Sequence, residues 1–256
     1  MAPFFILHKR RTVLEVSGPD SLAFLQGLVP GDVAKAPLYT ALLSPQGRFL
    51  ADFFIFPAEK GFFLTPEHVS APALLKKLSL YKLRRAVTLG LREDLFFMSV
   101  FAESGAPDPR SPALGVPLVG ASLPDLPSET EDTYDTLRYE SGISEGAEIG
   151  YDRGILLEHG FEAYGALSWT KGCYVGQELM ARTKHGGILR KKVYTIRFEG
   201  EAPSGDLTFQ GISQGRILGV SRQKSLGIAL LKTAAAQESQ ALGLPFLTEN
   251  MHPVWC

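Results

Sequence analysis

The chain has 256 residues, of which 45% are hydrophobic and 21% charged, as in a globular protein with a sizeable core. Its formal net charge of −1 gives no general attraction for nucleic acid or anionic lipid. The two cysteines, Cys173 and Cys256, make no disulfide framework, no Cys/His cluster has zinc-site spacing, and no apolar run approaches the ~20 residues that cross a bilayer. We therefore expect a reducing compartment, namely the cytoplasm or, for a eukaryotic chain, the mitochondrial matrix.

The first part of the chain predicts a strand, a helix and a hairpin in succession. Residues 12–17 alternate like a strand, and Gly-Pro-Asp-Ser at 18–21 opens an amphipathic helix. The strand-like runs 39–43 and 49–56 flank a turn of composition Ser-Pro-Gln-Gly-Arg, whose glycine is available for a positive φ. These runs predict a β-hairpin, which a third strand at residues 61–65 continues.

Residues 70–85 predict a basic helix. Leu74, Leu78 and Tyr81 share one of its faces. The rest of its surface carries Lys76, Lys77, Lys82, Arg84 and Arg85. Because no aromatic side chains are interleaved with these charges for base stacking, we interpret this surface as a solvated face, with a nucleic-acid-binding stripe as the alternative.

The middle of the chain changes character. Two predicted strands, 87–91 and 95–101, are followed by residues 103–132, which hold six prolines, show little periodicity and predict a linker or a long crossing loop. Residues 133–140 then predict a helix. From residue 191 onward the pattern becomes short strands with glycine turns, as in a small barrel or sandwich. These strands are 191–198, 206–209, 215–220 and 227–231. Together the elements predict a mixed α/β or α+β fold.

The densest chemistry lies at residues 171–178, Lys-Gly-Cys-Tyr-Val-Gly-Gln-Glu, which combine a thiol, an ammonium, a carboxylate and an amide. Residues 167–170 before them are β-prone, and residues 177–182 predict a short helix. Cys173 would then lie near a helix N-terminus, which together with Lys171 would lower the pKa of its thiol. The alternative is a small buried cysteine beside an ordinary surface lysine.

This stretch resembles the signature Lys-Gly-Cys-Tyr-x-Gly-Gln-Glu of the YgfZ-type folate-binding proteins, relatives of the aminomethyltransferase (T protein) of the glycine cleavage system. The resemblance extends through most of the chain, including the first helix, the first hairpin and the middle segment shared with T protein. The matching segments are 18–20, 24–27, 43–48 leading to Asp52, 137–142, and 157–158 before Trp169.

The resemblance implies an α+β, T protein-like fold with three small domains in a ring around a central tetrahydrofolate site, a ferredoxin-like element and a C-terminal β-barrel. The folate-binding core would comprise residues 1–42 plus 133–190. A hairpin and helix domain would span residues 43–132 and end in the proline-rich crossing segment, and the β-barrel would span residues 191–256.

The resemblance also implies a binding site for tetrahydrofolate or a one-carbon derivative. Glu158 matches the family's pterin-contacting glutamate, and a carboxylate can accept two adjacent pterin N–H donors. The anionic folate tail calls for a cation, for which Arg182 and Arg190 are the candidates; solvated surface charge is the alternative for each. Tyr174 or Trp169 would stack on the ring or simply pack in the core. The expected folate contacts are Glu158, Arg182, Arg190, Tyr174, Trp169 and Gln177.

The function implied is tetrahydrofolate binding in support of iron–sulfur cluster assembly or repair, including that of tRNA-modifying enzymes. The partners would be folate and iron–sulfur enzymes or assembly factors, with no membrane and no protein-bound metal. Cys173 would be the functional thiol and Lys171 its electrostatic partner. The chemical role of this cysteine stays open between a nucleophile, a transient cluster or partner contact, and a redox sensor.

Two alternatives remain. The first is a folate-dependent aminomethyltransferase or demethylase, in which Asp52 would be catalytic. T protein has two adjacent acidic residues in this hairpin, whereas this chain has Ala51-Asp52, which argues against glycine-cleavage chemistry. The second is an RNA-binding factor that uses the basic helix and a basic cluster after the signature. That cluster is Lys184, Arg190, Lys191 and Lys192.

Overall fold

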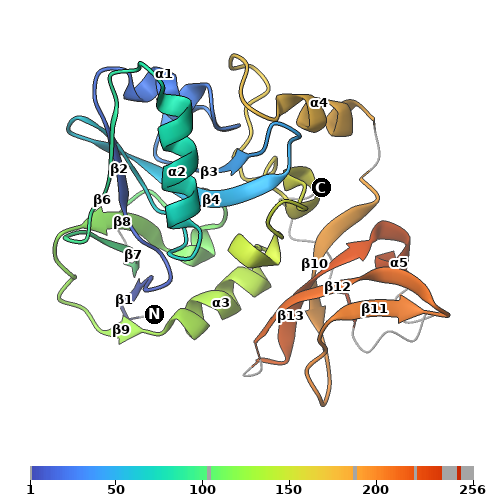
Figure 1. Ribbon diagram of the computed structural model, residues 1–256. Coiled ribbons are helices and arrows are strands. Elements are labelled where there is room, and N and C mark those ends of the chain that lie inside the picture. The colour runs from blue at the N-terminus through green and yellow to red at the C-terminus, as the bar shows by residue number, and fades with distance from the viewer. Residues whose placement is uncertain (1, 103–104, 187–188, 222–223, 238–246, 249–256) are drawn as a thin grey trace.

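The computed structural model describes residues 2–102, 105–186, 189–221, 224–237 and 247–248. The strands among them form three β-sheets. In Figure 1 the N-terminal sheets lie together with α1 and α2, and the C-terminal sheet lies beyond α3. No helix in these ranges is long and apolar enough to cross a membrane.

The first five-stranded sheet is antiparallel and contains the predicted hairpin. Its strands, in spatial order, are β3 (Leu38–Leu43), β4 (Phe49–Ala58), β5 (Gly61–Leu64), β2 (Leu14–Ser17) and β6 (Thr88–Leu91). The two helices beside it are α1 (Ser21–Gln26) and α2 (Ala71–Lys82). The strands and helices predicted over residues 12–91 are thus confirmed.

A four-stranded sheet uses the N-terminus and the proline-rich segment. Its strands, in spatial order, are β8 (Val116–Gly120), β7 (Phe96–Phe101), β1 (Phe4–Leu7) and β9 (Ser128–Glu129). The prediction that residues 103–132 form only a linker or a crossing loop is therefore wrong, because β8 pairs with β7 over five residue pairs. Pro117 is compatible with this strand because β8 lies at the edge of the sheet, where a missing N–H breaks no ladder.

The third sheet confirms the strands predicted after residue 191. Its order is β11 (Asp206–Phe209), β12 (Ile212–Ser221), β13 (Leu226–Lys232), β10 (Lys191–Arg197) and β14 (Leu247–Thr248), and α5 (Thr233–Gln237) follows β13. The boundaries of the three expected domains stay a prediction.

The middle segment is α3 (Glu131–Glu140), the 3₁₀ turns η3 (Gly146–Glu148) and η4 (Leu156–His159), and α4 (Gln177–His185). Thr130 caps α3 by accepting a hydrogen bond from the Thr133 N–H. The strand predicted at residues 167–170 is absent: Ser168 N–H donates to the Pro30 carbonyl at 3.0 Å, and this part of the chain forms bends instead of a ladder.

Strand β4 is buried on both faces and joins two hydrophobic clusters. Ala51, Phe53 and Ile55 pack with the cluster that includes α1 and α2, whereas Phe54 packs with aromatic and aliphatic residues of the middle segment. This alternation follows from the two-residue period of a strand. Asp52 belongs to the second face and is 1% exposed, so its carboxylate needs partners inside the protein.

Candidate functional site

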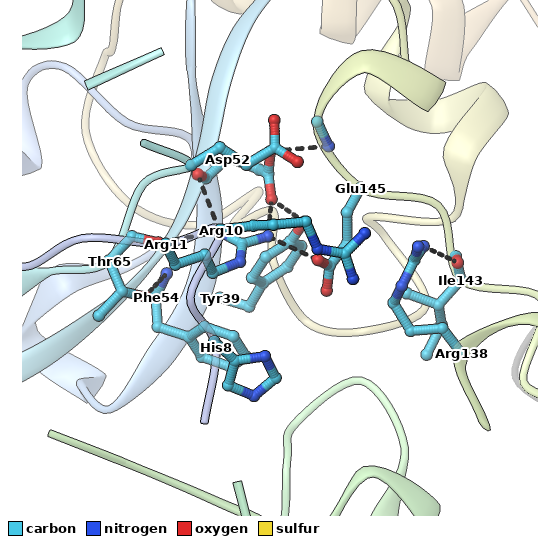
Figure 2. Close-up of polar contacts among 12 residues, drawn as sticks. His8, Arg10, Arg11, Tyr39, Asp52, Phe54, Thr65, Arg138, Ile143 and Glu145 are labelled. Carbon is cyan, nitrogen blue, oxygen red and sulfur yellow. Dashed lines mark hydrogen bonds and ion pairs between the residues drawn. The ribbon is translucent and has the colours of Figure 1, made fainter. Parts of the chain in front are cut away.

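A buried network of ion pairs surrounds Asp52 (Figure 2). Its Oδ2 atom accepts hydrogen bonds from Arg11 Nη2 at 2.6 Å and from the Tyr39 hydroxyl at 2.7 Å, and its Oδ1 atom accepts one from Gly146 N–H at 3.0 Å. Arg11 also donates to Glu145 Oε2 at 2.8 Å. Asp52, the catalytic candidate from the sequence, is therefore a fully engaged acceptor and not a free general base.

A second buried guanidinium extends this network. Arg110 contacts Asp108 through two of its nitrogens, at 3.0 and 2.8 Å, and pairs with Glu145 Oε1. Its guanidinium carbon lies 4.3 Å from the centroid of the Tyr39 ring. One cation thus meets two carboxylates and an aromatic face away from water.

The pKa values of these groups follow from the balance between burial and charge. Burial opposes the charged form of Arg11, but the carboxylates of Glu145 and Asp52 outweigh it and raise its pKa well above the ordinary value. Burial likewise opposes the charged form of Glu145, and Arg11 and Arg110 outweigh it and hold its pKa well below the ordinary value. Arg11 and Glu145 are therefore both charged near neutral pH.

A polar cavity of about 190 Å³ adjoins the network. Arg11, Glu67 and Glu145 contribute to its lining. Nothing in the sequence distinguished Arg11 from its neighbours Lys9 and Arg10, since all three belong to one basic run. Only the folded chain shows that Arg11 is buried while the Arg10 side chain is 54% exposed.

The loop that carries the signature is fixed by Lys171. Its Nζ atom donates to the carbonyls of Val29 and Gly31 at 2.6 and 2.8 Å and lies 5.4 Å from the centroid of the Tyr174 ring. Burial lowers the pKa of Lys171 to about 8, with Asp32 acting in the opposite direction. The ammonium group therefore connects the signature loop to the turn after α1.

Cys173 lies in this loop as an exposed free thiol, three residues before Gly176, the N-cap of α4. This position near a helix N-terminus agrees with the prediction. The alternative, a small buried cysteine, does not agree with the exposed thiol. The hydrogen bonds of the Lys171 ammonium go to two carbonyl groups. Its role as the electrostatic partner of the thiol stays a prediction.

Glu158 lies in η4 and is half-buried. Burial raises its pKa, while the cations of Lys191 and Arg48 oppose that shift. Its backbone N–H donates to the Ile155 carbonyl, but the described residues give its carboxylate no hydrogen bond or ion pair, so the carboxylate is available to a ligand with N–H donors. Of the residues expected to bind folate, this one has the chemistry that a pterin requires.

The other expected folate contacts occupy separate surroundings. Tyr174 is buried, its pKa is raised by burial to about 12, and its hydroxyl has no hydrogen-bond partner within the described ranges. The Trp169 indole donates to Glu162 at 2.9 Å, Arg182 lies 3.8 Å from Glu178, and Arg190 is exposed. Gln177 is the first residue of α4. The 190 Å³ cavity is lined by none of these side chains.

The residues present fit a bound folate in part. The free carboxylate of Glu158 suits the N–H donors of a pterin. At Asp52, Arg11 and Tyr39 already donate to Oδ2 and the Gly146 N–H to Oδ1. No group of three His, Cys, Asp or Glu side chains within the described part of the chain is arranged to hold a metal ion.

Comparison with known proteins gives the fold and the family. The structure is similar to the glycine cleavage system aminomethyltransferase T from Bartonella henselae, with a TM-score of 0.65 and 14% identity over 91% of this chain and 79% of that one, which confirms the predicted T protein-like α+β fold. No protein-family model matches the sequence.

The sequences similar to this chain include iron–sulfur cluster assembly factors named IBA57. The mitochondrial homolog from Pyricularia oryzae is 36% identical over 74% of this chain and 56% of its own length. The human mitochondrial protein is 31% identical over 86% of this chain and 75% of its own length. The chain spans little more than half of the fungal relatives that it matches. The predicted resemblance is confirmed, and the chain belongs to the IBA57 family of iron–sulfur cluster assembly factors, relatives of the YgfZ proteins.

Proposed function

We propose that this protein supports iron–sulfur cluster assembly and that Cys173 is the residue through which it contacts a cluster or a cluster-carrying partner. The observation that carries the proposal is the exposed free thiol on a loop anchored by Lys171, in a chain related to assembly factors. A thiolate is a preferred ligand of iron–sulfur clusters. Since the relatives are named as mitochondrial, the mitochondrial matrix is the proposed compartment.

The cysteine count sets how such a contact would work. A [2Fe–2S] or [4Fe–4S] cluster held by cysteines takes four thiolates, whereas the sequence contains two cysteines. Cys173 would therefore contribute one ligand to a cluster whose other ligands belong to a partner. This arrangement allows transfer, because one exposed ligand can be exchanged while the partner keeps the others.

The test compares C173S with C173A in cells that lack the endogenous protein. Activities of [4Fe–4S] enzymes in extracts should fall to the level of the deletion strain for both variants, while the purified variants keep the unfolding temperature of the parent chain. Full complementation by C173A would contradict the role of the thiol. Enzymes that modify tRNA are expected among the affected clients, and their products can be measured in the same strains.

Tetrahydrofolate binding at Glu158 is the second part of the proposal. Support comes from the T protein-like fold and from a half-buried carboxylate that lies near two cations and has no partner among the described residues. Folate, once bound, would supply a one-carbon carrier. Glu158 would accept the pterin N–H donors.

Calorimetry with tetrahydrofolate tests this binding separately from the cluster role. Saturable binding that E158Q weakens at least tenfold, about 1.4 kcal/mol, is expected. E59Q is the control, since Glu59 is an exposed carboxylate in the turn between β4 and β5. Absence of saturable binding to the parent chain would overturn the folate assignment and leave the role of Cys173 untouched.

An aminomethyltransferase activity receives no support from the geometry. The carboxylate of Asp52 is occupied by Arg11 and Tyr39, so it is not placed to receive a proton from a substrate. An RNA-binding role has no specific observation in its favour either.

A further inference from the structure

An apolar groove of about 500 Å³ is lined by residues of α2, of the β3–β4 hairpin and of the segment 151–152. Its floor includes Leu42, Ala51 and Leu74, each at most 2% exposed. Figure 1 shows α2 lying across this face of the sheet. The groove is therefore built on a rigid, well-packed layer of the protein.

Exposed apolar side chains form the upper part of the groove. Val69 is 75% exposed and Leu80 is 66% exposed, and both belong to the lining. The face of α2 that packs on the sheet uses other residues, namely Ala71, Leu74 and Leu78. Exposed apolar residues that border a concave surface mark a binding site more often than isolated ones do.

Two lysines give the groove a positive end. Lys76 and Lys77 both belong to the lining, and the described residues form no ion pair with either. Their aliphatic stems extend the apolar wall while the ammonium groups remain in contact with water. Asp152 is the carboxylate of the lining, so the lining carries one net positive charge. The sequence had indicated only a solvated basic face for this helix.

The groove touches the surroundings of the Asp52 network at one point, since Tyr151, which lines the groove, donates to Glu67, which lines the polar cavity. Ala51 lines the groove, and Asp52, the next residue of β4, directs its carboxylate to Arg11 on the opposite face of the strand. Glu158 and Cys173 are not among the residues that line the groove. A ligand in this groove would thus occupy neither the proposed cluster contact nor the proposed folate site.

We propose that this groove binds a small apolar molecule that carries one anionic group, such as a medium-chain carboxylate. The apolar body would cover Leu42, Ala51 and Leu74, and the anionic group would lie at Lys76 and Lys77. The volume of about 500 Å³ is within the range of small-molecule sites, roughly 300–1,000 Å³. The unpaired lysines favour an anion over a neutral or cationic ligand of the same shape.

Calorimetric titration of the full chain with decanoate tests the proposal, with decan-1-ol and decyltrimethylammonium as ligands of the same chain length. Saturable binding of decanoate, weaker binding of the alcohol and none of the cation are expected. Equal binding of decanoate and the alcohol would overturn the anion site. Absence of saturable decanoate binding would overturn the groove as a small-molecule site, and capture of a glutamate-rich amphipathic peptide in its place would assign it to a protein partner.

Matched variants on α2 locate the binding. A73F places a phenyl ring in the groove and should abolish binding, whereas S79F adds the same ring at an exposed position outside the lining and should not. The double substitution K76Q/K77Q should weaken binding roughly five- to tenfold, and K82Q should leave it unchanged. Unchanged binding by A73F, in protein with the parent unfolding temperature, would contradict the assignment.

Discussion

The Cα atom of Gly47 lies 2.9 Å from the position that a Cβ atom would take at Gly176, so the turn of the first hairpin and the signature loop meet through two glycines. Both residues have positive φ angles, 77° at Gly47 and 82° at Gly176. The glycine of the hairpin turn and the second glycine of the signature are thus required by the same contact.

Replacement of Gly176 by alanine should destabilise the protein. Alanine is strained at this φ angle, and its Cβ atom would lie 2.7 Å from the Ser44 carbonyl oxygen, so we expect a loss of about 1–3 kcal/mol in the free energy of unfolding. Gly172, in the same signature, has no heavy atom within 4 Å of a built Cβ atom. G172A is therefore the matched control, and equal urea midpoints for the two variants would contradict the explanation.

Removal of Arg11 should be among the most costly single substitutions. R11M leaves Asp52 and Glu145 without their shared cation, which costs about 3–5 kcal/mol for a buried pair. The neighbouring Arg10 pairs with Glu131 and Asp135 at the surface, so after solvent screening R10M should cost under about 1 kcal/mol. Urea unfolding of both variants measures the difference. Similar losses for both would show that the network is not a buried ion-pair system.

Two buried histidines should make the protein less stable in mild acid. Burial lowers the pKa of His8 and of His159 to about 3, below the ordinary value of 6.5. The unfolded chain therefore binds more protons than the folded one below pH 6.5. The contribution of the two histidines is flat above that pH and falls as pH decreases, by up to about 1.4 kcal/mol per pH unit for each histidine.

Urea midpoints between about pH 5 and pH 7 test this slope above the range in which most carboxylates titrate. H8N and H159N should each reduce the slope. H68N, which changes an exposed histidine, should leave it as it is in the parent chain. A parent protein whose midpoint does not change over this range would contradict the role of both histidines.

Loss of the Lys171 ammonium should loosen two loops together. K171M removes the donor to the Val29 and Gly31 carbonyls, so amide hydrogen exchange should accelerate in residues 27–31 and 168–175. K192M removes a lysine for which the described residues show no ion pair and should leave these amides unchanged. Faster exchange in only one of the two loops would argue against a shared clamp.

The sequence predicted helices and strands well where the apolar residues followed a single period, either that of a strand or that of a helix. The hairpin of β3 and β4 and the strands after residue 191 follow from alternation and glycine turns, and α2 follows from its apolar face. Strand β8 was missed because its proline and the prolines around it are typical of a loop. Its extended conformation comes from pairing with β7 at the edge of the sheet. Residues 167–170 were predicted as a strand from propensity, which their hydrogen bond to Pro30 overrides.

The site was predictable in part. The signature drew attention to Cys173, whose thiol is exposed, and the resemblance to Glu158, whose carboxylate has no partner among the described residues. The roles of both residues stay predictions. The engagement of Asp52 by Arg11 was not predictable, because the two residues are 41 positions apart and only the tertiary fold brings them together. The same holds for Arg110 and Glu145, 35 positions apart.

The network of Arg11, Arg110 and Glu145 also limits which fragments of the chain can fold when they are expressed alone. Its members come from the N-terminal strand region, the proline-rich segment and the turn before η3, so each segment supplies charge that another neutralises. A fragment that begins after Arg11 would carry two buried anions with one counter-ion fewer. We expect residues 2–148 to unfold cooperatively, and expression fragments that omit the first eleven residues to accumulate as unfolded or aggregated chain.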